Sequence, residues 1–191
     1  RGKPELWSVR DGAIVGSTRP AGIKANTFLV YEKPFEDFIL DLEFKVLGGN
    51  SGIQIRSEPP AEVGGEVRGY QADLGDSYWG SLYDELRRGM LAPAPQPLVA
   101  TFLRKDDWNQ YQVRAVGNRI TLRLNGLITA DYTEKDDAIP RRGVIALQLH
   151  AGDGFEAHFR NLRLREFPKK RLLYFTTAAC FLHSSPPLSR P

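Results

Sequence analysis

Cysteine is almost absent from this chain of 191 residues, in which the single cysteine, Cys180, lies near the C-terminal end. One cysteine excludes an intrachain disulfide and a cysteine-based metal site. Histidine is also scarce, with three residues, and there is one methionine. No apolar run is long enough to span a bilayer. The chain begins at Arg1 with neither an initiator methionine nor a signal-peptide pattern, so we expect a mature or trimmed chain.

Most of the chain also lacks an excess of positive charge. Lysine and arginine number 26 against 23 acidic residues, but the excess lies after residue 167, where there is no acid. The remainder is close to neutral, which argues against a nucleic-acid-binding body, because such a body needs a basic face. The hydrophobic fraction of 41% and the charged fraction of 26% are ordinary for a globular protein. The chain therefore predicts one domain with a substantial core.

The composition changes abruptly at residue 168. We expect a domain at 1–167 and a basic, apolar tail at 168–191. The apolar run at 172–182 is too short for a transmembrane helix. A poorly ordered appendage is the preferred interpretation, and a membrane-surface anchor is the alternative.

Sustained helical periodicity is absent, and short alternating segments take its place. They predict an all-β fold, an antiparallel two-sheet jelly-roll sandwich. A parity break near Asn161 indicates a bulge. The proline-rich stretch 92–100 is expected to be a loop, any helix is expected only as a turn near 83–88, and Trp7 and Trp108 are assigned to the core. About ten strands are expected, at or within 6–17, 27–30, 38–46, 52–56, 69–73, 108–116, 119–124, 127–132, 143–150 and 158–165.

Residues 49–91 are the stretch most suited to binding. The strands at 52–56 and 69–73 each offer an apolar face and a polar face, because side chains alternate across a strand. The polar faces carry planar and charged groups that suit convergent hydrogen bonding to an oxygen-rich ligand. These groups are Gln54, Arg56, Gln71 and Asp73, followed by Tyr78, Trp79, Tyr83, Asp84, Glu85, Arg87 and Arg88.

Three blocks make the sequence recognisable: GNSGIQIRSEP from residue 49, GYQADLGDSYWGSLYDE from residue 69 and IALQLHAG from residue 145. With neighbouring segments over nearly all of 6–166, the chain resembles the 3-keto-disaccharide hydrolase domain family, formerly a domain of unknown function. The resemblance implies a concanavalin A-like, laminarin G-like fold. It also implies a carbohydrate-active protein that acts on glycosides with a ketone at sugar carbon 3. Family members are usually exported in bacteria, which implies a periplasmic or extracellular location. The tail at 168–191 has no counterpart in the family.

Ordinary glycoside hydrolysis needs two carboxyl groups that flank one bond. Asp41 and Glu43 alternate on one strand, but the strand lacks a third acid and an aromatic setting. A 3-keto sugar permits another route, in which the ketone acidifies the hydrogen on carbon 2. A base removes that proton, the glycosidic oxygen leaves carbon 1, and water can add to the enone. Such a site needs a base and a group that stabilises the enolate.

The catalytic candidates are His150, Asp73 and Glu85. His150 lies on the same strand face as Gln148 and is a candidate base or metal ligand, against a structural hydrogen-bonding role. Asp73 could orient His150, bind a cation or cap the following turn. Glu85 could act as an acid, a base or a metal ligand, or lie in a solvated turn. A divalent cation held by such groups would polarise the ketone, although no ligand spacing here identifies a metal site.

The substrate-binding candidates are polar or aromatic groups from the same strands. Arg56 and Arg88 could instead form structural salt bridges, and Trp79 could be a core residue. A carbohydrate-binding module without catalysis, and an interaction domain, are the alternatives to an enzyme, because fold does not fix function. The predicted substrate-binding residues are Gln54, Arg56, Tyr70, Gln71, Trp79, Tyr83, Arg88 and Gln148.

Overall fold

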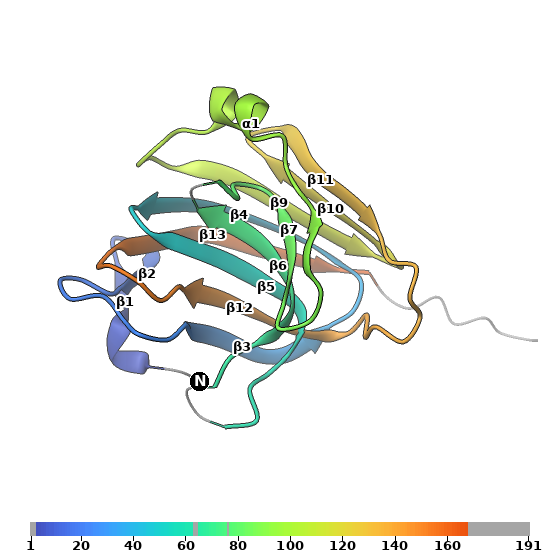
Figure 1. Ribbon diagram of the computed structural model, residues 1–191, viewed down its shortest axis with the longest axis horizontal. Helices are drawn as coiled ribbons and strands as arrows, with labels where there is room; N and C mark the ends of the chain where they lie inside the picture. Colours follow the sequence, from blue (N-terminus) through green and yellow to red (C-terminus); the bar gives the residue numbers. More distant parts are fainter. Residues whose placement is uncertain (1–2, 63–64, 76, 168–191) are drawn as a thin grey trace, which may run out of the picture.

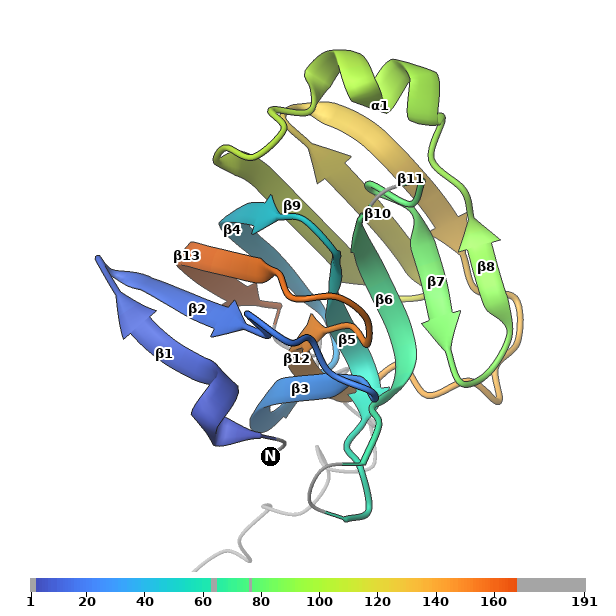
Figure 2. The same ribbon diagram turned by 60° about the vertical axis from the view of Figure 1, so that its left-hand side comes forward.

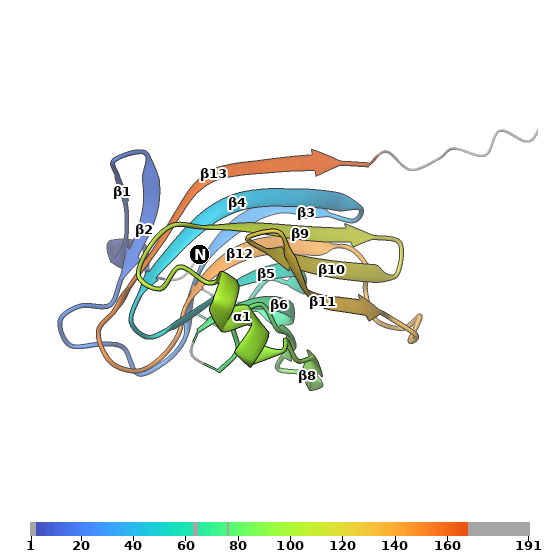
Figure 3. The same cartoon turned by 90° about the horizontal axis from the view of Figure 1, so that it is seen from above.

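The computed structural model describes residues 3–62, 65–75 and 77–167, so the expectations for the tail at 168–191 lie outside the described residues. The described part is an all-β sandwich of two antiparallel sheets, as predicted (Figure 1). Seen from above, β13 and β4 belong to one layer and β6 and β8 to the other (Figure 3). No helix in the described ranges combines the length and apolar character that a bilayer crossing requires.

The first sheet has seven strands in the order β1-β2-β13-β4-β9-β10-β11. Its strands are β1 (Trp7–Arg10), β2 (Ala13–Ser17), β13 (Glu156–Glu166), β4 (Phe38–Leu47), β9 (Asn109–Val116), β10 (Arg119–Leu124) and β11 (Leu127–Thr133). A 3₁₀ turn at Pro4–Leu6 precedes β1.

The second sheet has six strands in the order β3-β12-β5-β6-β7-β8, which Figure 2 follows from β3 across to β8. Its strands are β3 (Thr27–Phe35), β12 (Gly143–Leu149), β5 (Asn50–Glu58), β6 (Arg68–Gly75), β7 (Leu82–Glu85) and β8 (Gly89–Ala92). The short turn 48–49 joins β4 in one sheet to β5 in the other.

The core lies between the sheets and is built from the alternate residues that the sequence pattern indicated. Leu42 and Phe44 of β4 face inward, as do Ile53 of β5 and Leu147 of β12. Each such side chain contributes about 1.5–3 kcal/mol when it is fully removed from water. The same alternation leaves the other face of the six-stranded sheet, called its outer face below, to the polar residues between them.

The helix prediction was wrong. Residues 82–85 and 89–92 are strands, and the helix α1 is Gln96–Phe102, which begins inside the stretch 92–100 expected as a loop (Figure 1). Proline in the first turn is compatible with a helix, because the N–H that proline lacks has no intrahelical partner there. Burial of Val99 against the sandwich holds the helix in place.

The assignment of Trp108 to the core was wrong. Its ring lies under the guanidinium of Arg160, 3.9 Å from the ring centroid, and 5.1 Å from Nζ of Lys45, outside the core clusters of the described residues. Trp7, by contrast, packs against the core as predicted. The predicted bulge near Asn161 is confirmed by a register shift in the pairing of β13 with β4 and by a φ of 54° at Asn161.

Candidate functional site

The outer face of the six-stranded sheet carries a small cavity of about 190 Å³. Three strands supply the predicted catalytic residues to it: Asp73 from β6, Glu85 from β7, and His150 from the end of β12. The turns at the ends of β5 and β6 complete it. The lining residues are Asn50, Gln71, Asp73, Tyr78, Tyr83, Glu85 and His150.

A directional chain of amide hydrogen bonds runs along the floor of the sheet and ends on Asp73. Gln54 Nε2 donates to Gln71 Oε1 at 2.7 Å, and Gln71 Nε2 donates to Asp73 Oδ1 at 2.6 Å. Ser57 Oγ lies 2.9 Å from Gln54 Oε1 and anchors the far end. All four side chains are buried. We call this series of hydrogen bonds the amide relay. It fixes the position of the Asp73 carboxyl group, because each side chain in the series is hydrogen-bonded to the next.

The Asp73 carboxyl group has a pKa close to neutral pH. Burial raises the pKa of Asp73 to about 7, with a smaller contribution from the negative charge of Glu85, while the hydrogen bond from Gln71 opposes the rise. Burial also raises the pKa of Glu85, together with the charges of Glu66 and Asp84, and His150 opposes that rise. A carboxyl group with a pKa near 7 is suited to both giving and taking a proton at neutral pH.

His150 lines the cavity just beyond the end of β12. Its Nδ1 lies 2.7 Å from the carbonyl oxygen of Ala151. A carbonyl oxygen only accepts, so this contact assigns the proton to Nδ1 and leaves Nε2 of the neutral ring as an acceptor. The residue is exposed and has no hydrogen bond to Asp73 among the described contacts.

Gly52 makes the relay possible. It pairs with Asp73 on one side and with Gln148 on the other, and a Cβ at this position would lie 2.6 Å from Cδ of Gln71. Any side chain here would therefore occupy the space of the Gln71 amide, which hydrogen bonds hold at both ends.

Gly52→Ala is therefore expected to displace Gln71 and to raise the pKa of Asp73 by about one to two units, since a hydrogen bond to a charged group is worth about 1.5–3 kcal/mol. Carboxyl carbon NMR titration measures this directly. Gly75→Ala is the matched control, because its Cβ would crowd Asn50 at 2.8 Å instead of Gln71. An unchanged Asp73 pKa in Gly52→Ala would show that the relay does not act on the carboxyl group.

Gln148 and Asn50 carry amide atoms without hydrogen-bond partners among the described residues, and of the two only Asn50 lines the cavity. Both amide atoms of Gln148 and Oδ1 of Asn50 are buried and have no hydrogen-bond partner among the described residues. Buried polar groups are normally satisfied, so these atoms mark where the sheet can accept a polar ligand or a water. The sequence reasoning missed Asn50 and Tyr78 as lining residues. The Gly-Gly-Asn turn at 48–50 was the available signal for Asn50.

Of the eight predicted substrate-binding residues, only Gln71 and Tyr83 line this cavity. The six that do not line it are Gln54, Arg56, Tyr70, Trp79, Arg88 and Gln148. Arg56 is buried and donates to the carbonyls of Glu36 and Gly117 and to the carboxylate of Asp37. Tyr70 faces the core side, where its hydroxyl donates to Glu134 at 2.5 Å. Their partners give both residues structural roles in the sandwich.

Arg88 also has structural partners, since it bridges Asp84 and Glu134 at 2.6 and 2.7 Å. Burial alone would raise the pKa of Glu134, but hydrogen bonds from Arg88 and Tyr70 outweigh it and lower the pKa to about 2. Glu134 therefore stays charged at neutral pH and completes a network on the core side of the sheet. Trp79 stacks on Phe44, with ring centroids 6.0 Å apart, and lines a different cavity.

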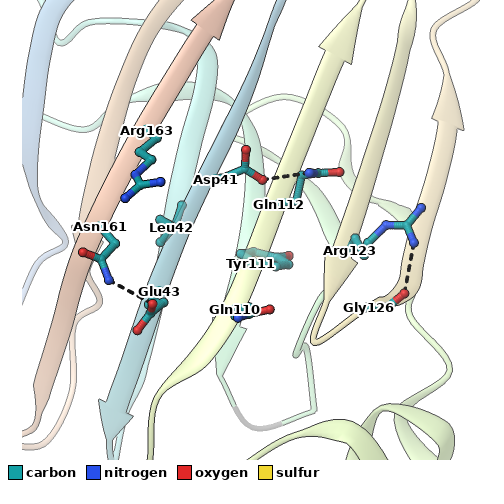
Figure 4. A pocket seen from close by; sticks show the side chains of 10 residues that line it. All are labelled: Asp41, Leu42, Glu43, Gln110, Tyr111, Gln112, Arg123, Gly126, Asn161 and Arg163. Carbon is teal, nitrogen blue, oxygen red and sulfur yellow. Dashed lines mark hydrogen bonds between the residues drawn. The ribbon is translucent and has the colours of Figure 1, made fainter.

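A larger cavity, of about 370 Å³, lies on the outer face of the seven-stranded sheet (Figure 4). It contains the alternating acids Asp41 and Glu43. Gln112 donates to Asp41 at 2.7 Å, and Asn161 donates to Glu43 at 2.9 Å. Hydrogen bonds from Asn161 and Arg160 lower the pKa of Glu43. A general acid needs a raised pKa, so this pair does not suit ordinary glycoside hydrolysis.

Within the described ranges, no three His, Cys, Asp or Glu side chains are grouped closely enough to hold a metal ion. The donor set of Asp73, Glu85 and His150 therefore does not fit a metal centre.

Comparison with known proteins places the chain in a wider context. Residues 1–165 match the profile of a family described as the 3-keto-alpha-glucoside-1,2-lyase-like domain. No curated protein matches the chain.

Three solved structures illustrate the fold. A candidate glycosyl hydrolase from Parabacteroides distasonis is 21% identical, with a TM-score of 0.62 over 87% of this chain and 93% of that one. The carbohydrate-binding module of family 66 from Bacillus subtilis is 17% identical, with a TM-score of 0.64 over 87% and 92%. A Bacillus subtilis protein of unknown function with a galectin-like fold is 11% identical, with a TM-score of 0.65 over 84% and 86%. At these identities the likeness shows a shared fold.

Proposed function

This chain belongs to the 3-keto-alpha-glucoside-1,2-lyase-like domain family, and we propose that it cleaves glycosides whose sugar ring carries a ketone at carbon 3. The observation that carries the proposal is the convergence of Asp73, Glu85 and His150, from three strands, on one small polar cavity. The family membership supplies the substrate class, and the cavity supplies groups able to move protons.

The reaction proceeds by elimination followed by hydration. The ketone at carbon 3 makes the hydrogen on carbon 2 acidic, and a base removes it to form an enolate. The electron pair then forms the double bond between carbons 1 and 2 as the bond from carbon 1 to the glycosidic oxygen breaks. The leaving oxygen takes a proton, and water adds across the double bond to give the free 3-keto sugar. No oxidant or reductant is consumed.

The cavity residues divide the proton transfers between them. Nε2 of His150 is the acceptor that takes the proton from carbon 2. Asp73, whose pKa is raised to about 7, is partly protonated at neutral pH and donates to the oxygen that becomes negative. The amide relay keeps that carboxyl group aimed and excludes water from its buried side. Glu85 and Tyr83 orient the sugar hydroxyls from β7.

We expect a 3-keto-α-glucoside to be cleaved and its unoxidised parent to be left intact. The parent lacks the ketone, so its hydrogen on carbon 2 is not acidic and the elimination cannot begin. The measurement is product formation by NMR or chromatography for both compounds, with and without a chelator. Equal rates on the two substrates would show that the ketone is irrelevant and would overturn the mechanism.

A carbohydrate-binding module without catalysis is the second candidate. Its support is the fold shared with the family 66 binding module and the exposed Tyr78 at the cavity edge, since aromatic side chains at such edges suit stacking on sugars. The same experiment separates the two candidates, because a binding module retains the 3-keto glycoside without consuming it. A periplasmic or extracellular location is proposed from the family resemblance alone.

A further inference from the structure

An apolar groove of about 580 Å³ lies along one flank of the sandwich, where the edge strand β3 of one sheet faces β13 of the other. Of the described residues that line it, all but Lys33 and Glu166 are apolar or aromatic. Tyr31 of β3 and Leu162 of β13 line the groove and remain 60% and 39% exposed. Contiguous apolar surface that stays open to water marks an interaction site, which single exposed apolar side chains do not.

The floor of the groove belongs to the core between the two sheets. Leu40 of β4 and Leu147 of β12 line the groove and are buried. On the wall, the ring of Tyr31 stacks on that of Phe35, with centroids 5.8 Å apart and an interplanar angle of 14°. An apolar side chain that entered the groove would therefore contact core residues and a stacked aromatic ring, and its removal from water would be favourable.

The described part of the chain ends beside this groove. The N–H of Phe167 donates to the carbonyl of Asp37, in the turn between β3 and β4, at 2.8 Å. The preceding residue, Glu166, lines the groove, and its carboxylate accepts from Nζ of Lys33 on β3 at 2.8 Å. Both contacts tie the end of β13 to β3 or to the turn that follows it. The segment that comes after Phe167 in the sequence therefore starts at the groove.

The sequence of that segment suits the groove in composition and length. After the linker 168–171 comes the run 172–182, LLYFTTAACFL, which has no charged residue. Four linker residues span at most about 14 Å, so the run begins close to Phe167. β3 is nine residues long, and the run is two residues longer. An extended run of that length can follow the whole of β3 along the groove.

The charges around Phe167 complement those of the linker. A neighbouring cavity of about 420 Å³, which Phe167 also lines, has three acidic and two basic residues in its wall. The linker carries two lysines and one arginine and no acid. Opposite charges at close range favour the approach of the linker to this end of the groove. The acids of the cavity are Glu36, Asp37 and Glu166, and the bases are Lys33 and Arg142.

We propose that the groove is the binding site for the run 172–182 of this same chain, which packs its apolar side chains on Leu40 and Leu147 between β3 and β13. Composition alone favours a poorly ordered appendage, because it shows that the run is apolar and not which surface lies within its reach. The inference does not depend on the proposed function, since the groove shares no lining residue with the Asp73 cavity.

Cys180 lies within the run and is the only cysteine of the chain, so its thiol reports whether the run is covered. Alkylation by iodoacetamide is measured for the full chain and for a synthetic peptide of residues 168–191 under the same conditions. We expect the full chain to react at least about tenfold more slowly, because burial of one large apolar side chain already favours a bound state by about that factor. Equal rates in the chain and the peptide would overturn the proposal.

A substitution in the groove tests where the run binds. Leu162→Asp is expected to restore most of the alkylation rate of the peptide, because it places a carboxylate where apolar side chains pack. Val9→Asp is the matched control, since Val9 is 76% exposed on β1 and does not line the groove. Thermal unfolding shows whether both variants are folded. A folded Leu162→Asp chain that keeps its protection, or a Val9→Asp chain that loses it equally, would contradict the proposed site.

An NMR measurement does not depend on the folding of Leu162→Asp. The methyl signals of Leu162 and Leu164 are compared between the natural chain and a full chain with Tyr174→Leu and Phe175→Leu, which removes two aromatic rings and keeps the run apolar. We expect the groove methyl signals to shift and those of Ile128, exposed on β11, to stay in place. Groove signals that do not move would overturn the proposal.

Two other occupants give different results. Protection of Cys180 that rises with protein concentration would assign the groove to the run of a second copy. Protection that appears only with vesicles of phosphatidylcholine and phosphatidylglycerol would assign the run to a membrane surface. Either result would overturn binding within one chain, for which protection is independent of concentration and present without lipid.

Discussion

Asp73→Asn is expected to lose activity and gain stability in the same variant. An asparagine retains the hydrogen bond from Gln71 and the shape of the side chain, but it cannot exchange a proton. Removal of a general acid or base typically costs a factor of about 10²–10⁴ in rate. Burial makes the charged carboxylate costly in the folded chain, which is why the pKa of Asp73 is raised to about 7. The neutral amide avoids that cost, so the substitution is expected to stabilise the fold while it removes the group that transfers the proton.

The sign of the stability change follows from the pKa. Below pH 4 the Asp73 carboxyl is protonated in both the folded and the unfolded chain, and the variant and the natural protein should be equally stable. Between about pH 4 and pH 7 the unfolded chain ionises first, so the natural protein loses stability relative to the variant. Above pH 7 the difference is constant at about 2–4 kcal/mol, or about 5–10 °C in Tm.

Thermal unfolding at pH 3.5 and pH 8, beside turnover of a 3-keto-glycoside, measures both effects. Asp41→Asn is the matched control, because Asp41 is exposed on the opposite sheet and accepts from Gln112. An Asp73→Asn variant with full turnover would remove Asp73 from the reaction and leave His150 and Glu85 as candidates. A variant less stable than the natural protein at pH 8 would contradict the raised pKa.

Arg56→Met is expected to destabilise the fold by about 3–5 kcal/mol, which corresponds to a fall in Tm of about 10 °C or more. The Arg56 side chain is 1% exposed and tied to three acceptors at 2.7–2.9 Å. Two belong to the turn between β3 and β4, and the third to the turn between β9 and β10. Methionine fills a similar volume but leaves the carbonyl groups of Glu36 and Gly117 without this donor.

Urea or thermal unfolding measures the loss, and turnover per folded molecule tests the role. Arg163→Met serves as the control, since it removes an exposed arginine from the outer face of the seven-stranded sheet. A stable Arg56→Met variant with lost turnover would assign Arg56 to the substrate. The expected pattern is the reverse, a destabilised variant whose folded fraction remains active.

The direction of the Arg56 side chain was not predictable from the sequence pattern. Strict alternation puts it on the same face as Gln54, and the polar face of β5 was predicted on that basis. The pairing of β5 with β6 shifts register between Ile55 and Glu58, and Arg56 adopts a φ of 47°. This irregularity points its side chain at the turns of the other sheet. The shift depends on how neighbouring strands pair, which is a property of partners distant in sequence.

Strand alternation predicted the directions of the cavity residues better than it predicted that of Arg56. Gln71, Asp73 and His150 lie on the faces that alternation assigned to them, and Tyr83 and Glu85 line the same cavity from β7. Arg88, three residues beyond Glu85, lies in the tight turn between β7 and β8, where period-two alternation no longer applies. Its two acidic partners, Asp84 and Glu134, then decide its direction. The direction of a charged side chain in a turn cannot be predicted from the sequence pattern, because it depends on which oppositely charged residue lies near it in the folded chain.

The sequence by itself determined the class of the fold, the inward and outward faces of the regular strands, and membership of the family. These depend on local alternation and on shared motifs, which one chain displays without its contacts. The tertiary structure decided which polar residues converge on one cavity and which are consumed by structural hydrogen bonds. It also decided that Asp73 has a pKa near 7 and that Tyr78 and Trp79, adjacent in sequence, serve two different cavities. The physical reason is that burial, hydrogen-bond partners and cavity walls are set by strands brought together from distant parts of the chain.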